Sequence, residues 1–183
     1  MSQKIILASS SPRRKELLEN AGFDFEVFPS NISEDIEEPD PHKYTKLLSI
    51  RKAQKVAEKY PDHLIIAADT MIFVDNQMLG KPNKYNDAYR MLKLLSEKKH
   101  AVITGVTIIS KEKVSTFSDE AHIELKKLSD SEIASFLSNS SPYDKAGGYS
   151  IEELPENFIK SIDGDISTIL GLPIHILTKH LKD

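Results

Sequence analysis

The sequence predicts an α/β fold in which a mixed β-sheet is flanked by helices. Three observations lead to this prediction. Apolar runs of strand length alternate along the chain with segments whose apolar residues recur at helical intervals. Two of the helical segments open with a capping residue followed by proline, at Ser11-Pro12 and at Asp40-Pro41. Two longer strand-like segments, 100–110 and 114–128, are separated only by a short turn and form a hairpin.

The first third of the chain is predicted to form strand, helix, strand and helix. The apolar run "KIILAS" (4–9) has strand length, and a helix with an apolar stripe follows from Pro12 to Ala21. "FEVFP" (25–29) has the composition of a short strand. An acidic connection over 30–41 then leads to a helix at about 42–59, whose apolar residues are mostly at helical spacing.

The middle of the chain is predicted to be rich in strands. "HLIIAADT" (63–70) has the pattern of a buried strand that stops at an acid. "MIFVDNQML" (71–79) has the pattern of a strand, a turn at Asp75-Asn76 and a returning strand. A helix is expected at about 87–97, and the long hairpin described above comes next.

The last third begins with a helix start that is clear from the sequence. Ser129 and Glu132 form a capping box, which predicts a helix to about Leu137. The glycine-containing segment 144–154 is expected to be irregular, and "FIKSI" (158–162) has the pattern of a strand. A closing helix is predicted to begin near Pro173.

Composition indicates one folded globular domain of 183 residues, because 39% of the residues are apolar and 28% are charged. The absence of cysteine excludes disulfides, thiolate metal sites and cysteine nucleophiles, and it fits a cytoplasmic protein. The chain shows neither a signal-peptide pattern nor an apolar run of about 18 residues, so we expect neither export nor a membrane span. A net charge of −4 argues against binding of a nucleic-acid polymer, although a small anion such as a nucleotide remains compatible.

"SSSPRR" (9–14) is the first candidate site. A helix N-terminus offers unpaired N–H groups and the positive end of the helix dipole, so hydroxyls and guanidinium groups placed there suit a phosphate. Arg13 and Arg14 would oppose the dipole of their own helix unless an anion were bound. The alternative is that Ser11 only caps the helix and both arginines are solvated.

Three further positions could carry chemistry. Asp69 follows an apolar run and could act as a general base or hold a divalent metal, and the alternative is a turn-forming aspartate. Lys81, in "GKP", could direct an ammonium group at phosphate, or it could be a solvated loop lysine. The acidic run that contains Glu34 could supply a metal ligand, although such runs are usually solvated.

Taken together, "ASSSPRR", "AADT" followed by "GKP", "DKAGGYSI" and a closing "GLP" resemble the Maf family of nucleoside triphosphate pyrophosphatases over nearly the whole chain. The resemblance implies a single domain over 1–183 with an elongated α/β fold similar to inosine triphosphate pyrophosphatases and a cleft between two lobes. It also implies hydrolysis of a nucleoside triphosphate to the monophosphate and pyrophosphate, with Mg²⁺, Mn²⁺ or Co²⁺, in the housekeeping of the nucleotide pool. A homodimer is a further expectation. The alternative function is that of a nucleotide-binding regulator of cell division and septum formation with little turnover.

The resemblance also implies roles for individual residues. Asp69 would be the general base, and Lys52 and Lys81 would be the catalytic lysines. Glu34 and Asp69 would hold the metal ion. The residues that would bind phosphate are Ser9, Ser11, Arg13 and Arg14, and those that would set substrate specificity are Arg13, Thr70 and Glu152.

Glu152 is a departure from the pyrimidine-preferring branch of the family, which has glutamine there. A glutamine can donate and accept, which suits uracil or thymine, whereas an ionised glutamate only accepts. The branch that acts on 7-methyl-GTP carries a glutamate at this position. Arg13 and Thr70 follow the pyrimidine branch instead, so the candidate substrates are dTTP and UTP on one side and 7-methyl-GTP or CTP on the other. Glu152 could also pair with Arg13 or face solvent.

Overall fold

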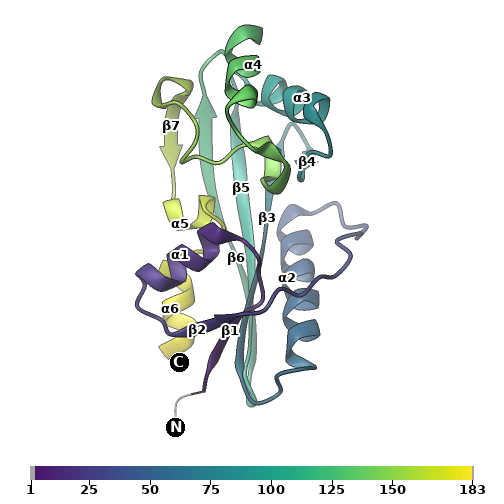
Figure 1. Cartoon of the computed structure of the whole chain (residues 1–183), viewed down its shortest axis with the longest axis vertical. Helices are drawn as coiled ribbons and strands as arrows, with labels where there is room; N and C mark the ends of the chain where they lie inside the picture. Colours follow the sequence, from purple (N-terminus) through teal and green to yellow (C-terminus); the bar gives the residue numbers. More distant parts are fainter. Residues whose placement is uncertain (1–2, 183) are drawn as a thin grey trace. The chain divides into compact units, whose positions relative to one another are not determined.

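The computed structural model describes residues 3–182, which form an α/β fold with one mixed sheet flanked by helices (Figure 1). Within these residues the sheet has seven strands in the order β2-β1-β3-β5-β6-β7, and β4 pairs with β3 beside this path. The strands are β1 (Ile5–Leu7), β2 (Phe25–Val27), β3 (Leu64–Val74), β4 (Gln77–Leu79), β5 (Lys99–Ile109), β6 (Val114–Leu125) and β7 (Ile159–Asp163). The α-helices are α1 (Pro12–Asn20), α2 (Pro41–Ala57), α3 (Tyr85–Leu95), α4 (Asp130–Ser138), α5 (Ile166–Ile169) and α6 (Ile174–Lys182). The predicted fold class is confirmed.

The chain divides into two compact units. The first unit contains the residues up to Thr70, Thr104–Asp119 and the residues from Ile166 onward, and the second contains Met71–Ile103 and Glu120–Asp165. Strands β3, β5 and β6 each contribute residues to both units. The predicted cleft concerns how the two units are arranged, and it stays a prediction. No helix within residues 3–182 has the length and apolar character needed to cross a membrane.

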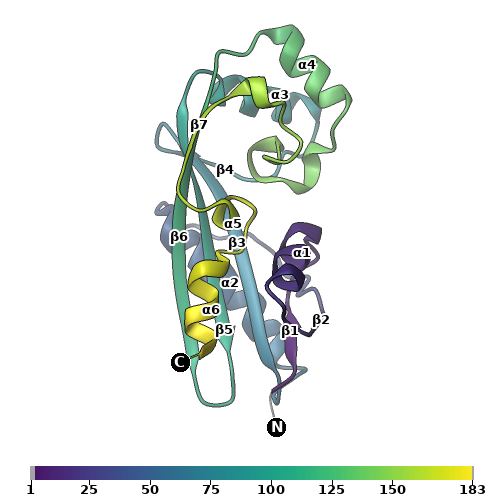
Figure 2. The same ribbon diagram turned by 90° about the vertical axis from the view of Figure 1, so that its left-hand side faces the viewer.

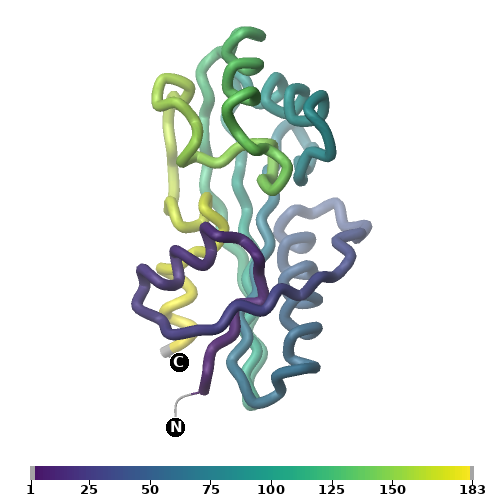
Figure 3. The backbone as a smooth tube through the Cα atoms, in the orientation of Figure 1, coloured from purple at the N-terminus to yellow at the C-terminus, as the bar shows by residue number. Residues whose placement is uncertain are grey.

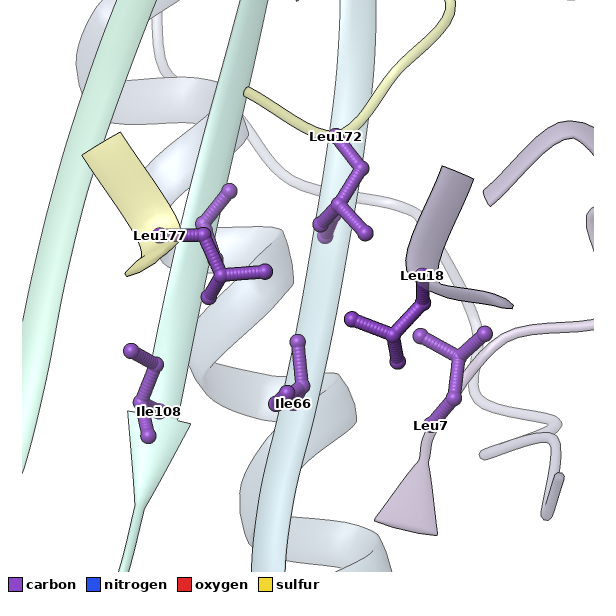
Figure 4. Close-up of a cluster of buried hydrophobic side chains, with 8 residues drawn as sticks. Leu7, Leu18, Ile66, Ile108, Leu172 and Leu177 are labelled. Atoms are coloured by element: carbon purple, nitrogen blue, oxygen red, sulfur yellow. The ribbon is translucent and has the colours of Figure 1, made fainter. Parts of the chain in front are cut away.

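In the first unit, neighbouring residues of β3 pack on opposite faces of the sheet, as the alternation of side chains along a strand requires. Ile65 and Ala67 pack with Ala53 and Val56 of α2. The other face carries a cluster that includes residues of α1 and α6, and Figure 2 shows α2 and α6 on opposite sides of the strands. The buried residues of this second cluster are Leu7, Leu18, Ile66, Ala68, Val106, Ile108, Leu172 and Leu177 (Figure 4).

Helix α2 approaches strand β5 closely because residue 105 is a glycine. A Cβ atom at Gly105 would lie 2.4 Å from the backbone carbon of Thr45, which no side chain could tolerate without moving the helix. One turn after Thr45, Ser49 Oγ lies 2.8 Å from Thr107 Oγ1 on β5. Lys52 follows Thr45 by about two helical turns and therefore faces the sheet as well.

Both capping motifs that contain proline begin helices as predicted. Ser11 Oγ accepts a hydrogen bond from the backbone N–H of Arg14, and Asp40 Oδ1 accepts one from the N–H of Lys43 at 3.0 Å. Gly22 follows α1 with a φ of +81°, a conformation that glycine adopts without strain. Residues 28–40 join β2 to α2 without regular secondary structure and include nearly all of the predicted acidic connection (Figure 3).

The prediction that a strand ends at Thr70 is wrong. β3 continues without a break to Val74, so Asp69 and Thr70 lie inside the strand and not at its end. The reason is that Met71, Ile72 and Val74 are all buried, which extends the strand past its two polar residues. The predicted turn at Asp75-Asn76 is confirmed. These two residues have φ values of +47° and +59°, and β4 begins directly after them.

The second unit contains α3, α4, β4 and β7, and its 144–154 segment is irregular as predicted apart from short 3₁₀ turns. The capping box of α4 is confirmed, because Ser129 N donates to Glu132 Oε2 at 2.8 Å and Ser129 Oγ accepts from Glu132 N.

His100 is buried, with Nε2 2.5 Å from the Tyr149 hydroxyl oxygen, and burial lowers the pKa of its imidazole to about 4. The four-residue helix α5, in the first unit, has no counterpart among the predicted elements.

Candidate active site

Three charged side chains meet in the first unit around the amino group of Lys52. Lys52 Nζ lies 2.7 Å from Asp69 Oδ1 on β3 and 2.7 Å from Glu34 Oε1 in the acidic connection. Asp69 is only 6% exposed and Lys52 8%, whereas the side chain of Glu34 is 41% exposed. Burial raises the pKa of the Asp69 carboxyl, and the positive charges of Lys52 and Arg14 act in the opposite direction.

A buried aspartate with a raised pKa and a cationic partner has the properties of a general base. Because Lys52 holds Oδ1, the carboxylate is fixed in orientation. The structure thus brings Glu34, Lys52 and Asp69 together, although these residues are far apart in the chain.

The same carboxylates fit a divalent cation of the Mg²⁺ type, because they already converge on one positive charge and both offer hard oxygen ligands. Across residues 3–182 there is no group of three or more His, Cys, Asp or Glu side chains that could hold a metal ion. A metal at Glu34 and Asp69 would therefore take its other ligands from water and from phosphate, as Mg²⁺ commonly does.

Arg14 has a different environment from the one that the sequence predicted. Its guanidinium donates hydrogen bonds to Gly171 O, Ser9 Oγ, Ala68 O and Thr70 Oγ1, at 2.8–3.2 Å. The pKa of Arg14 is lowered because the guanidinium is buried, and the negative charge of Asp69 offsets part of this effect. A guanidinium has five N–H groups, so most of its capacity is used within the protein. Arg14 thus fastens the end of β1, the middle of β3 and the loop before α6, and we do not assign it to phosphate.

Ser9 lies at the centre of these contacts. Its hydroxyl oxygen accepts from Arg14 Nη1 and from the backbone N–H of Ser11, both at 3.2 Å. A hydroxyl oxygen has two acceptor lone pairs, so the remaining capacity of Ser9 is to donate its proton. Ser11 caps α1, and Arg13 is a partly buried cation in the first turn of that helix.

Thr70 lies on the same face of the sheet as Arg14. Its Oγ1 accepts from Arg14 Nη2 at 3.0 Å and lies 3.0 Å from Oγ1 of Thr104 on β5. The hydroxyl of Thr104 donates to the carbonyl oxygen of Thr168 at 2.8 Å. Sequence reasoning missed Thr104, because threonine in the strand pattern "HAVITGVTIIS" carries no signal of its own.

Lys81 and Glu152 belong to the second unit. Lys81 is exposed and follows Gly80, whose carbonyl oxygen accepts from Gly147 N at 2.9 Å. Glu152 is also exposed, and its Oε2 accepts from Ser150 Oγ at 3.4 Å. The other predicted site residues all lie in the first unit: Ser9, Ser11, Arg13, Arg14, Glu34, Lys52, Asp69 and Thr70.

Comparison with known proteins gives consistent results. A family model described as Maf-like protein matches residues 4–183. A protein of Thermosipho africanus named dTTP/UTP pyrophosphatase is 48% identical over 93% of this chain and 88% of its own length. Proteins with the same name from Acholeplasma laidlawii and Bacillus cereus are 44% and 43% identical, each over 98% of this chain and 95% of their own length.

Two solved structures are also similar to this chain. The Ham1 protein of Staphylococcus aureus has a TM-score of 0.49 at 12% identity, over 67% of this chain and 72% of the other. A nucleoside-triphosphatase, dITP/XTP pyrophosphatase, of Mycobacterium abscessus has a TM-score of 0.46 at 17% identity, over 68% and 75%.

Proposed function

The chain belongs to the Maf-like protein family, and on this basis we propose that it is a nucleoside triphosphate pyrophosphatase with dTTP and UTP as its preferred substrates. The reaction would give the nucleoside monophosphate and pyrophosphate. The observation that carries the proposal is the buried Asp69 carboxylate, held by Lys52 beside Glu34. The names of relatives 42–48% identical over most of their length support the choice of substrates.

In this proposal Asp69 accepts a proton from the attacking water. The water oxygen forms a bond to one phosphorus of the α–β anhydride, the bond from that phosphorus to the bridging oxygen breaks, and the nucleoside monophosphate and pyrophosphate separate. Lys52 already holds Oδ1 of Asp69, so we assign Oδ2 to the water. Glu34 and Asp69 would hold a Mg²⁺, Mn²⁺ or Co²⁺ ion, which supplies stabilisation of the negative charge on the phosphates.

The phosphates would be bound by donors and cations of the chain. Ser9 can only donate, and a phosphate oxygen only accepts, so the two are complementary. Arg13 and the N-terminus of α1 add positive charge. The role of Lys81 in binding phosphate stays a prediction from the sequence. Arg14 supports this group indirectly, because it orients the hydroxyl of Ser9.

Glu152 is the residue that bears on the alternative substrates. An ionised glutamate accepts hydrogen bonds only, which would favour a base edge with donors such as guanine or cytosine. The relatives named dTTP/UTP pyrophosphatase favour the pyrimidine substrates, as do Arg13 and Thr70. We therefore propose that Glu152 tunes the preference for the base and does not reverse it.

The test is a panel of dTTP, UTP, CTP, GTP, 7-methyl-GTP and ITP with Mg²⁺ or Mn²⁺, with all phosphate products separated. We expect monophosphate and pyrophosphate, with dTTP and UTP turned over fastest. Asp69→Asn should lose turnover and keep nucleotide binding, because it keeps the shape of the side chain and loses its basicity. Asp62→Asn is the matched control, since Asp62 is an exposed aspartate paired with Lys111.

Three results would speak against the enzyme. Release of orthophosphate and a diphosphate would show cleavage of a different bond. An unchanged rate in Asp69→Asn would remove this residue from the mechanism. Nucleotide binding without any turnover, with metal present, would favour a nucleotide-binding regulator of cell division. The predicted homodimer can be examined in the same preparations by light scattering.

A further inference from the structure

The backbone of the acidic connection is hydrogen-bonded to helix α2 at Glu34 and at the residue after it. The hydroxyl of Tyr44 donates to the carbonyl oxygen of Glu34 at 3.2 Å. Arg51 Nη1 donates to the carbonyl oxygen of Asp35 at 3.4 Å. The backbone around Glu34 therefore has a defined position, although it forms no regular secondary structure.

The backbone and the carboxylate of Glu34 are held by different residues of α2. Arg51 follows Tyr44 by about two helical turns, so both side chains leave the helix on the same side. Lys52 is the next residue, and its Nζ binds the carboxylate of Glu34 at 2.7 Å. The contact from Tyr44 to the Glu34 carbonyl does not depend on where this carboxylate points. The carboxylate can therefore change its partner while the backbone stays in place.

The hydroxyl of Tyr44 remains a neutral donor under working conditions. Its pKa is raised above the ordinary value of about 10, first by burial and then by the negative charges of Asp69 and Glu34. The hydroxyl thus keeps its proton at neutral pH and donates it to the Glu34 carbonyl. Because this group is uncharged, its removal leaves the charges of the site unchanged. An effect of its removal on a cation would then arise from the position of Glu34.

We propose that Tyr44 is a positioning residue, which holds the backbone of Glu34 on α2 so that the Glu34 carboxylate can pass from Lys52 to a divalent metal ion. This inference rests on the proposed function, in which Glu34 and Asp69 hold the metal. Residues that keep a metal ligand in place contribute about ten- to a hundredfold to metal affinity. Without the Tyr44 hydroxyl, binding of the metal would have to order the backbone of Glu34 as well, and this cost lowers the affinity.

The experiment measures the dissociation constant of Mn²⁺ in the absence of nucleotide, from the electron paramagnetic resonance of the free ion. Tyr44→Phe keeps the aromatic ring and should weaken Mn²⁺ binding by about tenfold. Tyr143→Phe is the matched control, because Tyr143 is 50% exposed and belongs to the second unit, and it should keep the wild-type affinity. In turnover of UTP, Tyr44→Phe should need more Mn²⁺ for half-maximal activity. Its kcat at saturating Mn²⁺ should stay close to that of wild type, because the filled site is the same.

A double-mutant cycle with Glu34→Gln shows whether Tyr44 acts through Glu34. In the Glu34→Gln background, Tyr44→Phe should have little further effect on the Mn²⁺ dissociation constant, because the carboxylate that Tyr44 positions is gone. An equal effect of Tyr44→Phe in both backgrounds would overturn the inference. Wild-type Mn²⁺ affinity in Tyr44→Phe would also overturn it, since a merely structural role changes the unfolding midpoint in EDTA and not the affinity for the metal.

The inference and the proposed function can fail separately. If wild type binds Mn²⁺ but releases no pyrophosphate from UTP or dTTP, the proposed function fails, and the Mn²⁺ affinities of the variants still decide the role of Tyr44. If wild type releases pyrophosphate but binds no Mn²⁺, the inference fails and the proposed reaction stands.

Discussion

Replacing Lys52 by methionine would remove the charge on which two carboxylates converge, at 2.7 Å each. Glu34 is half exposed and can be solvated, but Asp69 is buried and loses its closest counter-charge. Two responses are available to Asp69. It can stay ionised and unpaired, which costs about 3–5 kcal/mol for a broken buried pair. It can instead take up a proton, which costs about 1.36 kcal/mol for each pH unit above its ordinary pKa of about 3.9.

The second response limits the cost and makes it depend on pH. At pH 7 protonation costs about 4 kcal/mol, and at pH 5 about 1.5 kcal/mol. The sign follows from the pKa of Asp69, which lies above its unfolded value, so ionisation opposes folding more strongly as the pH rises. Wild type already incurs part of this cost, because burial raises the pKa of its own Asp69. We therefore expect Lys52→Met to lower the free energy of unfolding by at most about 4 kcal/mol at pH 7 and by at most about 1.5 kcal/mol at pH 5.

The assay is urea unfolding at pH 5 and pH 7 in the presence of EDTA, so that no metal ion compensates for the lost ammonium. Lys55→Met is the matched control on the same helix, because Lys55 and Glu58 form an exposed pair and such pairs contribute about 0–1 kcal/mol. A destabilisation by Lys52→Met that is equal at both pH values, or no larger than that of Lys55→Met, would refute the reasoning.

The other predictions concern His100, Gly171 and the metal. The buried imidazole has a pKa of about 4 against an ordinary 6.5, so its stabilising effect is complete above pH 6.5 and declines as the pH falls toward 4. His100→Gln should remove about 2.5 kcal/mol of this acid-induced loss, measured by urea unfolding at pH 7 and pH 4.5. Gly171→Ala should cost about 1–3 kcal/mol and reduce turnover, because φ is +99° and the new Cβ would crowd Thr70. Gly22→Ala, with a φ of +81° and open space around it, is the control that carries only backbone strain. Removal of metal by EDTA should stop turnover and leave the unfolding midpoint nearly unchanged, since Lys52 continues to neutralise the carboxylates. A large fall in the midpoint would show that the metal, and not Lys52, holds the site together.

Local signals predicted much of the fold. Three helix starts depend on hydrogen bonds between residues three positions apart: Ser11-Pro12, Asp40-Pro41 and the capping box at Ser129. Such local bonds can be predicted from neighbouring residues in the sequence. The turn at Asp75-Asn76 is local in the same sense. These elements begin or turn within about two residues of the predicted positions.

The errors occur where partners far apart in the chain decide the outcome. Asp69 and Thr70 look like the polar end of a strand, yet Lys52 and Arg14 satisfy them inside it. Arg14, for which the sequence offered a phosphate ligand or solvent as partner, is hydrogen-bonded within the protein, and one of its partners, Gly171, lies 157 positions further along the chain. The buried hydroxyl of Thr104 donates to the carbonyl oxygen of Thr168, a partner that no pattern within its own strand indicates.

The continuity of β3 has a further consequence for how this site can vary. Asp69 and Thr70 are consecutive residues of one strand, so Asp69 meets α2 on one face of the sheet while Thr70 meets α1 on the other. Substitutions on one face can therefore change the contacts of Asp69 without changing those of Thr70, and the reverse also holds. Insertion or deletion of a single residue earlier in β3 would turn both side chains to the opposite face of the sheet, so Asp69 would lose its contact with α2 and Thr70 its contact with α1. We expect related chains to differ here by replacement of residues and to keep the length of this strand segment.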